Sequence, residues 1–268
     1  MFLLRAAVRL LFPPRCQLCG APGEFPLCGG CLHTFPQIRP PFCPRCGHPL
    51  VARGAAPLRC RGCPGEGAAY TRARAWGAYD GPLREAIHTL KFGRRRALAG
   101  PLGALLAGLA ASDPGLQRVQ AIVPVPLHPQ RQRERGFNQA HLLAAEVGRA
   151  LGVPVEARVL ERGRPTPAQA ELSAASRRAN VRGAFILRGA VRWARVLVVD
   201  DVMSTGSTVG ECAQVLRQGG AGEVAVLTLA RTVRTGPAEA AGSALRWPGG
   251  AAWRPGGPGA PPGPGEWR

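Results

Sequence analysis

The sequence predicts an α/β protein with a doubly wound parallel sheet, preceded by a small N-terminal module that is rich in cysteine. Three observations support this class. Short aliphatic runs alternate with amphipathic helices from about residue 70 onward, which is typical of a parallel sheet. Eight cysteines lie within residues 16–63. In addition, 46% of the 268 residues are hydrophobic, which is enough to bury a core.

Each element of the α/β part is predicted from its local pattern. The four side chains of Val196–Val199 are all aliphatic, which is typical of a strand buried on both faces. Gly219 and Gly220 mark the end of the helix that follows this strand. Strands are predicted near residues 73–79, 121–125, 183–187, 195–199 and 223–229. Helices are predicted near residues 82–91, 97–111, 138–151 and 208–218.

These elements divide the chain into three parts. Residues 1–69 are predicted to form a short amphipathic helix followed by a zinc-binding module, and residues 70–235 form the α/β domain. Residues 236–268 form a tail, in which 13 of the 22 residues from Trp247 onward are Gly or Pro. Such a segment cannot form a packed core, so we expect it to be disordered. No run approaches the ~18 apolar residues of a transmembrane helix, and we expect a cytoplasmic protein without a membrane span.

The eight clustered cysteines form four Cys-x-x-Cys pairs. Two thiolates at this spacing reach one ion from a tight turn, and Zn²⁺ prefers four such ligands in a closed structural site. A disulfide framework is the alternative, but it is typical of secreted proteins and no secretion signal is recognisable. The sequence leaves open whether one or two ions bind, and whether the pairs combine in sequential or crossed order. The predicted ligands are Cys16, Cys19, Cys28, Cys31, Cys43, Cys46, Cys60 and Cys63.

A second motif follows the strand at Val196–Val199. Asp200 and Asp201 are predicted to end this strand, and a loop of small residues leads from them into the next helix. Backbone N–H groups at such a junction can surround a phosphate, while carboxylates suit the hydroxyls or the positive centre of a sugar beside it. A generic strand-to-helix turn with a Ser or Thr cap is the alternative. The predicted phosphate loop comprises Met203, Ser204, Thr205, Gly206, Ser207 and Thr208.

Basic residues follow another predicted strand, at residues 121–125. His128, Arg131, Arg133 and Arg135 lie in the segment after it, which is predicted to be a loop. Guanidinium groups bind phosphate oxygens in a bidentate manner, so these residues are candidates for a polyanionic ligand. A solvated surface, or contact with nucleic-acid phosphates, are the alternatives. The α/β domain carries 24 basic and 12 acidic residues of a chain with a formal net charge of +19, and Lys91 is its one lysine.

These motifs together carry a family resemblance. Asp200-Asp201-Val-Met-Ser-Thr-Gly-Ser-Thr208 is similar to the phosphoribosyl-pyrophosphate (PRPP) signature of type I phosphoribosyltransferases. The cysteine-rich N-terminus resembles the double zinc ribbon of the ComF family, whose members are competence-associated phosphoribosyltransferase-like proteins. Two further segments agree, Leu90-Lys-Phe-Gly93 and Val123-Pro-Val-Pro-Leu-His128 leading to Arg135-Gly-Phe-Asn-Gln139. The similarity covers roughly residues 5–235.

The resemblance implies a type I phosphoribosyltransferase-like fold and a pentosyl transfer from PRPP, bound with Mg²⁺, to an acceptor that the sequence does not identify. It implies that the loop holds the 5-phosphate, that Asp200 and Asp201 are catalytic and bind the ribose hydroxyls, and that His128 and the three arginines lie on the pyrophosphate side. Residues 161–180 would form a lid, in which Thr166, Gln169, Arg177 and Asn180 match family positions.

The resemblance also implies a role in natural competence and DNA uptake, with single-stranded DNA and a helicase-like competence protein as partners. A second hypothesis keeps the same fold without turnover. In it the protein is a non-catalytic accessory that binds single-stranded DNA through its basic surface and zinc ribbons.

In the transferase hypothesis, one further residue is a candidate for the acceptor side of the site. Arg231 follows the last predicted strand and is a candidate to face the acceptor.

Overall fold

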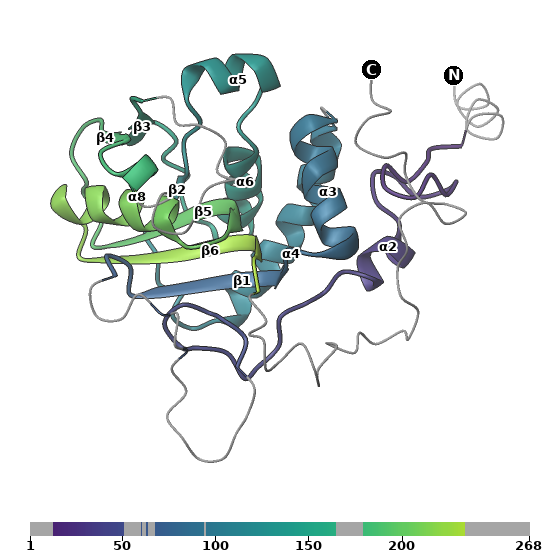
Figure 1. Ribbon diagram of the computed structural model, residues 1–268, viewed down its shortest axis with the longest axis horizontal. Helices are drawn as coiled ribbons and strands as arrows, with labels where there is room; N and C mark the ends of the chain where they lie inside the picture. Colours follow the sequence, from purple (N-terminus) through teal and green to yellow (C-terminus); the bar gives the residue numbers. More distant parts are fainter. Residues whose placement is uncertain are drawn as a thin grey trace.

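The computed structural model describes residues 13–50, 60, 63, 68–93, 95–164 and 179–233, and Figure 1 shows their arrangement. Three predictions lie outside these residues: the N-terminal helix, the tail at 236–268, and most of the lid, including Thr166, Gln169 and Arg177.

Four parallel strands form the central sheet, in the order β1 (Arg72–Ala78), β6 (Glu223–Arg231), β5 (Arg195–Met203) and β2 (Ala121–Pro124). Neighbouring strands in this sheet are parallel, so each connection must cross over the sheet, as α8 (Ser207–Gln218) does between the consecutive strands β5 and β6. The run Val196–Val199 is fully buried at its centre. The predicted doubly wound parallel class is therefore confirmed.

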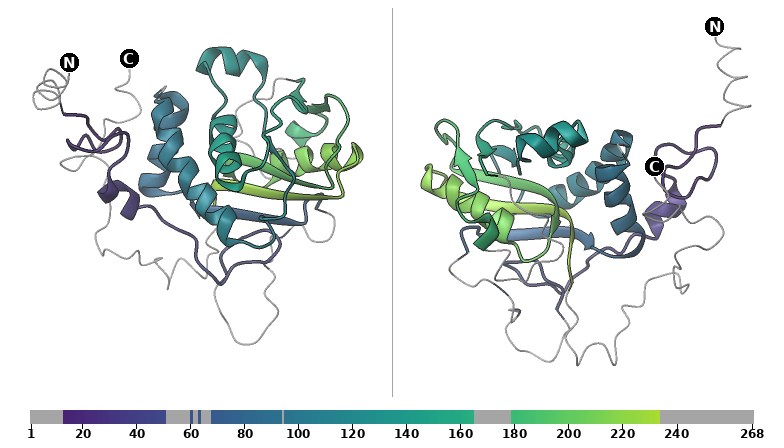
Figure 2. Two further views of the ribbon diagram at one scale, coloured as in Figure 1. Left: turned by 180° about the vertical axis from the view of Figure 1, so that it is seen from behind. Right: turned by 45° about the horizontal axis from the view of Figure 1, so that its top comes forward.

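Helices cover both faces of this sheet (Figures 1 and 2). The helices α3 (Gly81–Phe92), α4 (Ala99–Ser112) and α6 (Gln139–Leu151) share a hydrophobic cluster with Leu197 and Val199 of β5. Helix α8 (Ser207–Gln218) shares a second cluster with Val196 and Val198. Alternate residues of β5 thus face opposite sides of the sheet. In the described part of the chain, no helix is long and apolar enough to span a bilayer.

Three sequence predictions are corrected. The strand near 183–187 is β4 (Phe185–Leu187), but it pairs antiparallel with the unpredicted β3 (Leu160–Arg162) in a separate two-stranded sheet. The segment that contains Arg131, Arg133 and Arg135 is a short helix, α5 (Pro129–Arg135), rather than the predicted loop. All its residues are polar apart from the initial Pro129, so no hydrophobic periodicity reveals it. Finally, the strand predicted at 195–199 is longer: β5 continues to Met203, because it pairs with β6 as far as Arg231.

The cysteine-rich module lies along the free edge of the sheet. After the short helix α2 (Gly29–His33), residues 36–38 run antiparallel beside β1. The amide of Ile38 donates to the carbonyl of Trp76 at 2.9 Å, and the amide of Ala78 donates to the carbonyl of Pro36 at 2.8 Å. The module therefore extends the hydrogen-bonding of β1, and it covers an edge that would otherwise be exposed to pairing with other chains.

We predict that Gly77→Ala destabilises the protein by about 1–3 kcal/mol. A Cβ at Gly77 would lie 2.6 Å from Leu83 Cδ2 and 2.7 Å from the Pro36 carbonyl oxygen, so it would push this linker off β1. Gly108→Ala is the control, because Gly108 lies in α4 and a Cβ there would meet no atom of the described residues within 4 Å beyond its chain neighbours and the backbone of its own helix. There the change should stabilise by about 0.5–1 kcal/mol. Thermal unfolding measures both, and equal effects would contradict the close approach at Gly77.

Candidate functional site

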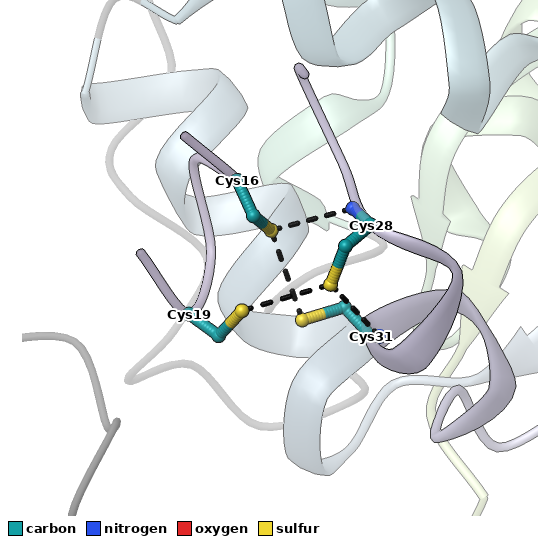
Figure 3. A group of neighbouring side chains, drawn as sticks. All are labelled: Cys16, Cys19, Cys28 and Cys31. Carbon is teal, nitrogen blue, oxygen red and sulfur yellow. Dashed lines mark hydrogen bonds between the residues drawn. The ribbon is translucent and has the colours of Figure 1, made fainter. Parts of the chain in front are cut away.

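The cysteines form two groups of four, combined in sequential order. The first group is Cys16, Cys19, Cys28 and Cys31 (Figure 3), and in each group the four Sγ atoms lie within 4.8 Å of one another. The Sγ atoms of Cys16 and Cys31 are 3.8 Å apart, and those of Cys19 and Cys28 are 3.6 Å apart. A tetrahedral ion with bonds of ~2.3 Å needs about 3.8 Å between its ligands. These residues therefore fit a structural Zn²⁺.

The second group consists of Cys43, Cys46, Cys60 and Cys63. Burial raises thiol pKa values, yet three backbone N–H groups that point at the sulfur of Cys43 hold its pKa at about 6. Cys16 occupies the same place in the first group, and its pKa is also about 6 for the same reason. Each group thus contains a thiol that is readily deprotonated, as a zinc ligand must be. Both groups are closed, so they are structural sites without an open position for catalysis.

The two acids of the predicted site lie within β5 rather than after it. On one side the ladder with β2 ends at Val199, while on the other side it continues along β6, where Asp200 pairs with Thr228. Asp200 and Asp201 are 9% and 3% exposed. Consecutive strand residues point to opposite faces, so Asp200 lies on the α8 side and Asp201 on the α3 side. Sequence reasoning treated them as one pair, but they serve two faces of the sheet.

Lys91, near the end of α3, was missed as a site residue. Its Nζ lies 2.9 Å from Oδ2 of Asp201, as an ion pair rather than an aligned hydrogen bond. On the other face, burial raises the pKa of Asp200 to about 7, and the charge of Asp201 adds to this rise while Lys91 opposes it. Lys91 was recognisable as the one lysine among 35 basic residues. One compact cation thus balances a pair of buried acids.

The predicted phosphate loop connects the end of β5 with α8. Met203 is buried and ends β5, and Gly206 has a left-handed conformation with φ of 79° at the N-cap of α8. Having no side chain, Gly206 cannot cap the helix, and the first turn of α8 contains no acidic residue. The hydroxyls of Thr205 and Ser207 lie 2.7 Å apart at this turn. Such a helix terminus, with hydroxyl donors around it, is suited to an anion.

The basic residues of α5 differ in their distance from the acids. Arg135 is half-buried, and burial lowers the pKa of its guanidinium. The charges of Asp201 and Asp200 oppose this change, which shows that Arg135 lies within the field of both acids. Arg133 is exposed. His128 caps α5, because its Nδ1 accepts from the amide of Gln130 at 3.3 Å. The structure therefore brings Arg135 toward the acids, whereas Arg133 faces solvent and His128 has a local structural contact.

A row of rings beside the acids was also missed by sequence reasoning. Tyr79 Oη lies 2.8 Å from Nε2 of His88, and the His88 ring lies 5.6 Å from that of Phe92. The guanidinium of Arg135 lies 5.2 Å from the centre of the Phe92 ring. Phe92 nevertheless remains 68% exposed. Burial, together with the charge of Lys91, lowers the pKa of His88, which favours a neutral imidazole in this row.

Arg231 does not have the surroundings predicted for it. It is buried at the end of β6, and its Nη1 donates to the carbonyl of Cys46 in the second cysteine group. The suggestion that Arg231 faces an acceptor is therefore wrong. The cysteine-rich module passes below β1 (Figure 1), from Gln37 beside Gly77 to Arg45 beside Ala73, and thereby places the carbonyl of Cys46 within reach of the Arg231 side chain.

The fold and the site define an α/β protein with a double zinc ribbon and a loop suited to an anion. The chain matches the double zinc ribbon domain family over residues 7–64. It is 37% identical to DNA utilization protein YhgH of Salmonella typhimurium over 230 residues, which cover 84% of this chain and 100% of that protein. It is 35% identical to Competence protein F of Haemophilus influenzae over 212 residues, covering 76% and 90%.

The chain belongs to the family of these competence and DNA utilization proteins, the ComF family. A more distant relative is Competence protein ComFC of Streptococcus pneumoniae, which is 25% identical over 208 residues, covering 76% of this chain and 87% of that protein. Among solved structures, the chain is similar to a purine phosphoribosyltransferase from Pyrococcus horikoshii, with a TM-score of 0.29 and 15% identity. The match covers 49% of this chain and 80% of the other.

We predict that Asp200→Asn stabilises the ligand-free protein at alkaline pH. The pKa of Asp200 is raised in the folded state, so the folded protein loses stability as the pH rises from about 4 to about 7, and this loss persists above pH 7. The variant lacks this buried charge. Its free energy of unfolding at pH 8 should therefore exceed that of the wild type by on the order of 1–4 kcal/mol. Denaturant unfolding measures the difference.

This difference in the free energy of unfolding should become smaller as the pH falls from 8 to 6, a range in which the thiols are still expected to bind zinc. Asp80→Asn is the matched control, because Asp80 is an exposed N-cap of α3 and Asn caps a helix as well as Asp. A constant difference over this pH range for Asp200→Asn would contradict the raised pKa of Asp200.

Proposed function

We propose that this protein is a phosphoribosyltransferase that binds PRPP through the segment from Asp200 to Thr208. The observation that carries the proposal is the order of features along β5 and α8: two buried carboxylates, then a helix start with Gly206 as its N-cap and the hydroxyls of Thr205 and Ser207 beside it. A sugar phosphate matches both parts, because its phosphate suits the loop and its hydroxyls suit the carboxylates.

In this proposal the ribose 5-phosphate occupies the loop at Ser204–Thr208, where backbone N–H groups and hydroxyls donate to its oxygens. Asp200 accepts from the ribose hydroxyls, and this contact favours its charged form over the protonated form that burial favours. Asp201 is already ionically paired with Lys91. Negative charge beneath the ring would stabilise the oxocarbenium-like transition state as the anomeric bond breaks.

The pyrophosphate leaving group is assigned to the α5 side. Arg135 and Arg131 are the donors in this proposal, because Arg135 lies in the field of the two acids and Arg131 in turn lies in the field of Arg135. Mg²⁺ usually keeps several waters and binds through few carboxylates plus the phosphates of its substrate. The acids fit that limited role, and the ion would supply charge neutralisation of the leaving group. The acceptor is not assigned.

The proposal is tested by calorimetric titration of PRPP in the presence of Mg²⁺. The wild-type protein should bind saturably, and the double variant Asp200→Asn with Asp201→Asn should bind more weakly by at least roughly 10-fold. Asp80→Asn should bind like the wild type, since this exposed acid lies at the start of α3. Absence of PRPP binding by the folded wild-type protein would show that the transferase proposal is wrong.

A second candidate function, binding of single-stranded DNA in natural competence, is favoured by one observation. Phe92 is exposed, and Arg135 stacks on it next to the exposed Arg133. An aromatic ring beside arginines is the combination on which single-stranded nucleic acids stack their bases and place their phosphates. In this function a helicase-like competence protein would be a partner. The two functions share Arg135, but the loop at Ser204–Thr208 and the Phe92 ring are separate groups, so substitutions at each can test one function at a time.

We expect Phe92→Ala to weaken binding of an oligonucleotide by roughly 10-fold, because stacking of one base is lost. The salt dependence should stay the same, since no charge is removed. Arg133→Ala should instead reduce the slope of log K against log salt by about 0.7. Phe25→Ala is the control, because Phe25 is also an exposed ring but lies in the zinc module. Fluorescence anisotropy measures all four proteins, and equal losses for both Phe variants would refute the assignment.

A further inference from the structure

We propose that the second zinc ribbon is a structural part of the phosphate site, and that Arg231 and Tyr70 are the residues that connect the two. The first zinc ribbon has no such role. The inference rests on the proposed function, in which the loop at Ser204–Thr208 holds a phosphate. It adds that the integrity of one zinc centre controls the geometry of this loop.

The second ribbon is hydrogen-bonded to the sheet through the turn between Cys43 and Cys46. Three consecutive carbonyls of its first turn accept hydrogen bonds from the strands. Arg74 donates to Pro44 at 2.9 Å, the amide of Ala73 donates to Arg45 at 2.6 Å, and Arg231 donates to Cys46. The turn is therefore held by the first residues of β1 and by the last residue of β6, so a change in the ribbon must affect both strands.

The close packing at Gly47 supports the same conclusion. A Cβ at this residue would lie 2.6 Å from the carbonyl oxygen of Ala73, so the backbone of the ribbon touches the backbone of β1. Arg74 also lies over the ring of Phe42 at 4.9 Å, and its Nε bonds to Asp113 at 2.7 Å. The second ribbon is thus fastened by backbone and side-chain contacts that leave little freedom for it to move independently.

Arg231 connects the second ribbon to the loop. Arg231 pairs with Met203 across the β5–β6 ladder, and the amide of Thr232 donates to the carbonyl of Met203 at 3.0 Å. Met203 is the residue from which the loop begins, and its Cε would lie 2.8 Å from a Cβ at Gly206. The arginine that holds the carbonyl of Cys46 therefore belongs to the same strand end that supports the loop.

Tyr70 provides a second connection. Tyr70 is 2% exposed, and its buried hydroxyl has no hydrogen-bond partner among the residues that the structure describes; it lies 3.5 Å from the position of a Cβ at Gly206. Its carbonyl accepts from Arg45 of the ribbon at 3.5 Å. Tyr70 thus lies between the ribbon and the loop. A buried hydroxyl aimed at the loop without a partner indicates a place where a ligand or a small loop movement completes the bonding.

The first ribbon makes a contact of the same kind but at another place. Arg95 donates to the carbonyl of Gln17 at 2.8 Å, and Cys16, Leu18 and Leu27 pack in the cluster on the α3 and α4 side. This ribbon lies beside α3 (Figures 1 and 2) and packs in the cluster on that face of the sheet, whereas the loop leads into α8 on the other face. The chain therefore contains a matched pair of arginines, Arg231 and Arg95, each holding one zinc-ribbon turn.

The test compares Arg231→Met with Arg95→Met. Both variants should retain the zinc content of the wild type, because all eight thiols remain. Arg231→Met should speed amide hydrogen exchange in residues 204–210, including the Gly210 amide that donates to Gly206 at 2.8 Å, and weaken PRPP binding by roughly 10-fold. Arg95→Met should leave exchange in residues 204–210 unchanged. Equal exchange in 204–210 for both variants would overturn the proposal.

Three further variants keep the test decisive if Arg231→Met does not fold. Tyr70→Leu should speed exchange in residues 204–210 with both zinc ions retained. Cys63→Ser should do the same with loss of one zinc ion, whereas Cys31→Ser should lose one zinc ion without changing exchange in 204–210. Exchange in 204–210 that follows total zinc loss, regardless of which ribbon is changed, would also overturn the proposal. If the wild type does not bind PRPP but the exchange contrast holds, the proposed function fails while the connection stands.

Discussion

The ion pair between Lys91 and Asp201 allows β5 to carry two adjacent carboxylates inside the sheet. A buried carboxylate is costly unless it is paired, and the two acids also repel each other. Because they point to opposite faces, each is separated from the other by the strand itself, and Lys91 compensates the one on the α3 side. Asp200 is not compensated to the same extent, and burial together with the charge of Asp201 raises its pKa. A group held in this way is suited to a ligand that supplies hydroxyls.

The zinc ribbons extend the α/β domain rather than hang beside it. Residues 36–38 add to the edge of β1, and the turn between Cys43 and Cys46 accepts from both β1 and β6. A metal centre that fixes a turn adds stability to whatever the turn contacts, because metal-binding free energy becomes folding free energy. This arrangement accounts for the burial of Arg231. Burying a charged side chain is costly, and the carbonyl of Cys46 accepts a hydrogen bond from its guanidinium.

Much of this fold could be predicted from the sequence, because its signals are local. The aliphatic run Val196–Val199 and the small residues after it define β5 and α8, and the Cys-x-x-Cys spacing defines the zinc ligands. Helix α5 escaped prediction because it has no apolar face. The short pairing of β3 with β4 depends on segments distant in the sequence. Lys91 and Arg231 likewise meet their partners only through the tertiary fold, so local patterns could not assign them.

The most direct test of the central claim is a titration of the Asp200 carboxyl carbon by NMR, with and without ribose 5-phosphate. We predict a pKa of about 7 for Asp200 in the free protein and a clear decrease when the sugar phosphate binds, because its hydroxyls favour the charged carboxylate. A pKa near the ordinary value of about 4 in the free protein, or a raised pKa that the bound sugar phosphate leaves unchanged, would contradict the account.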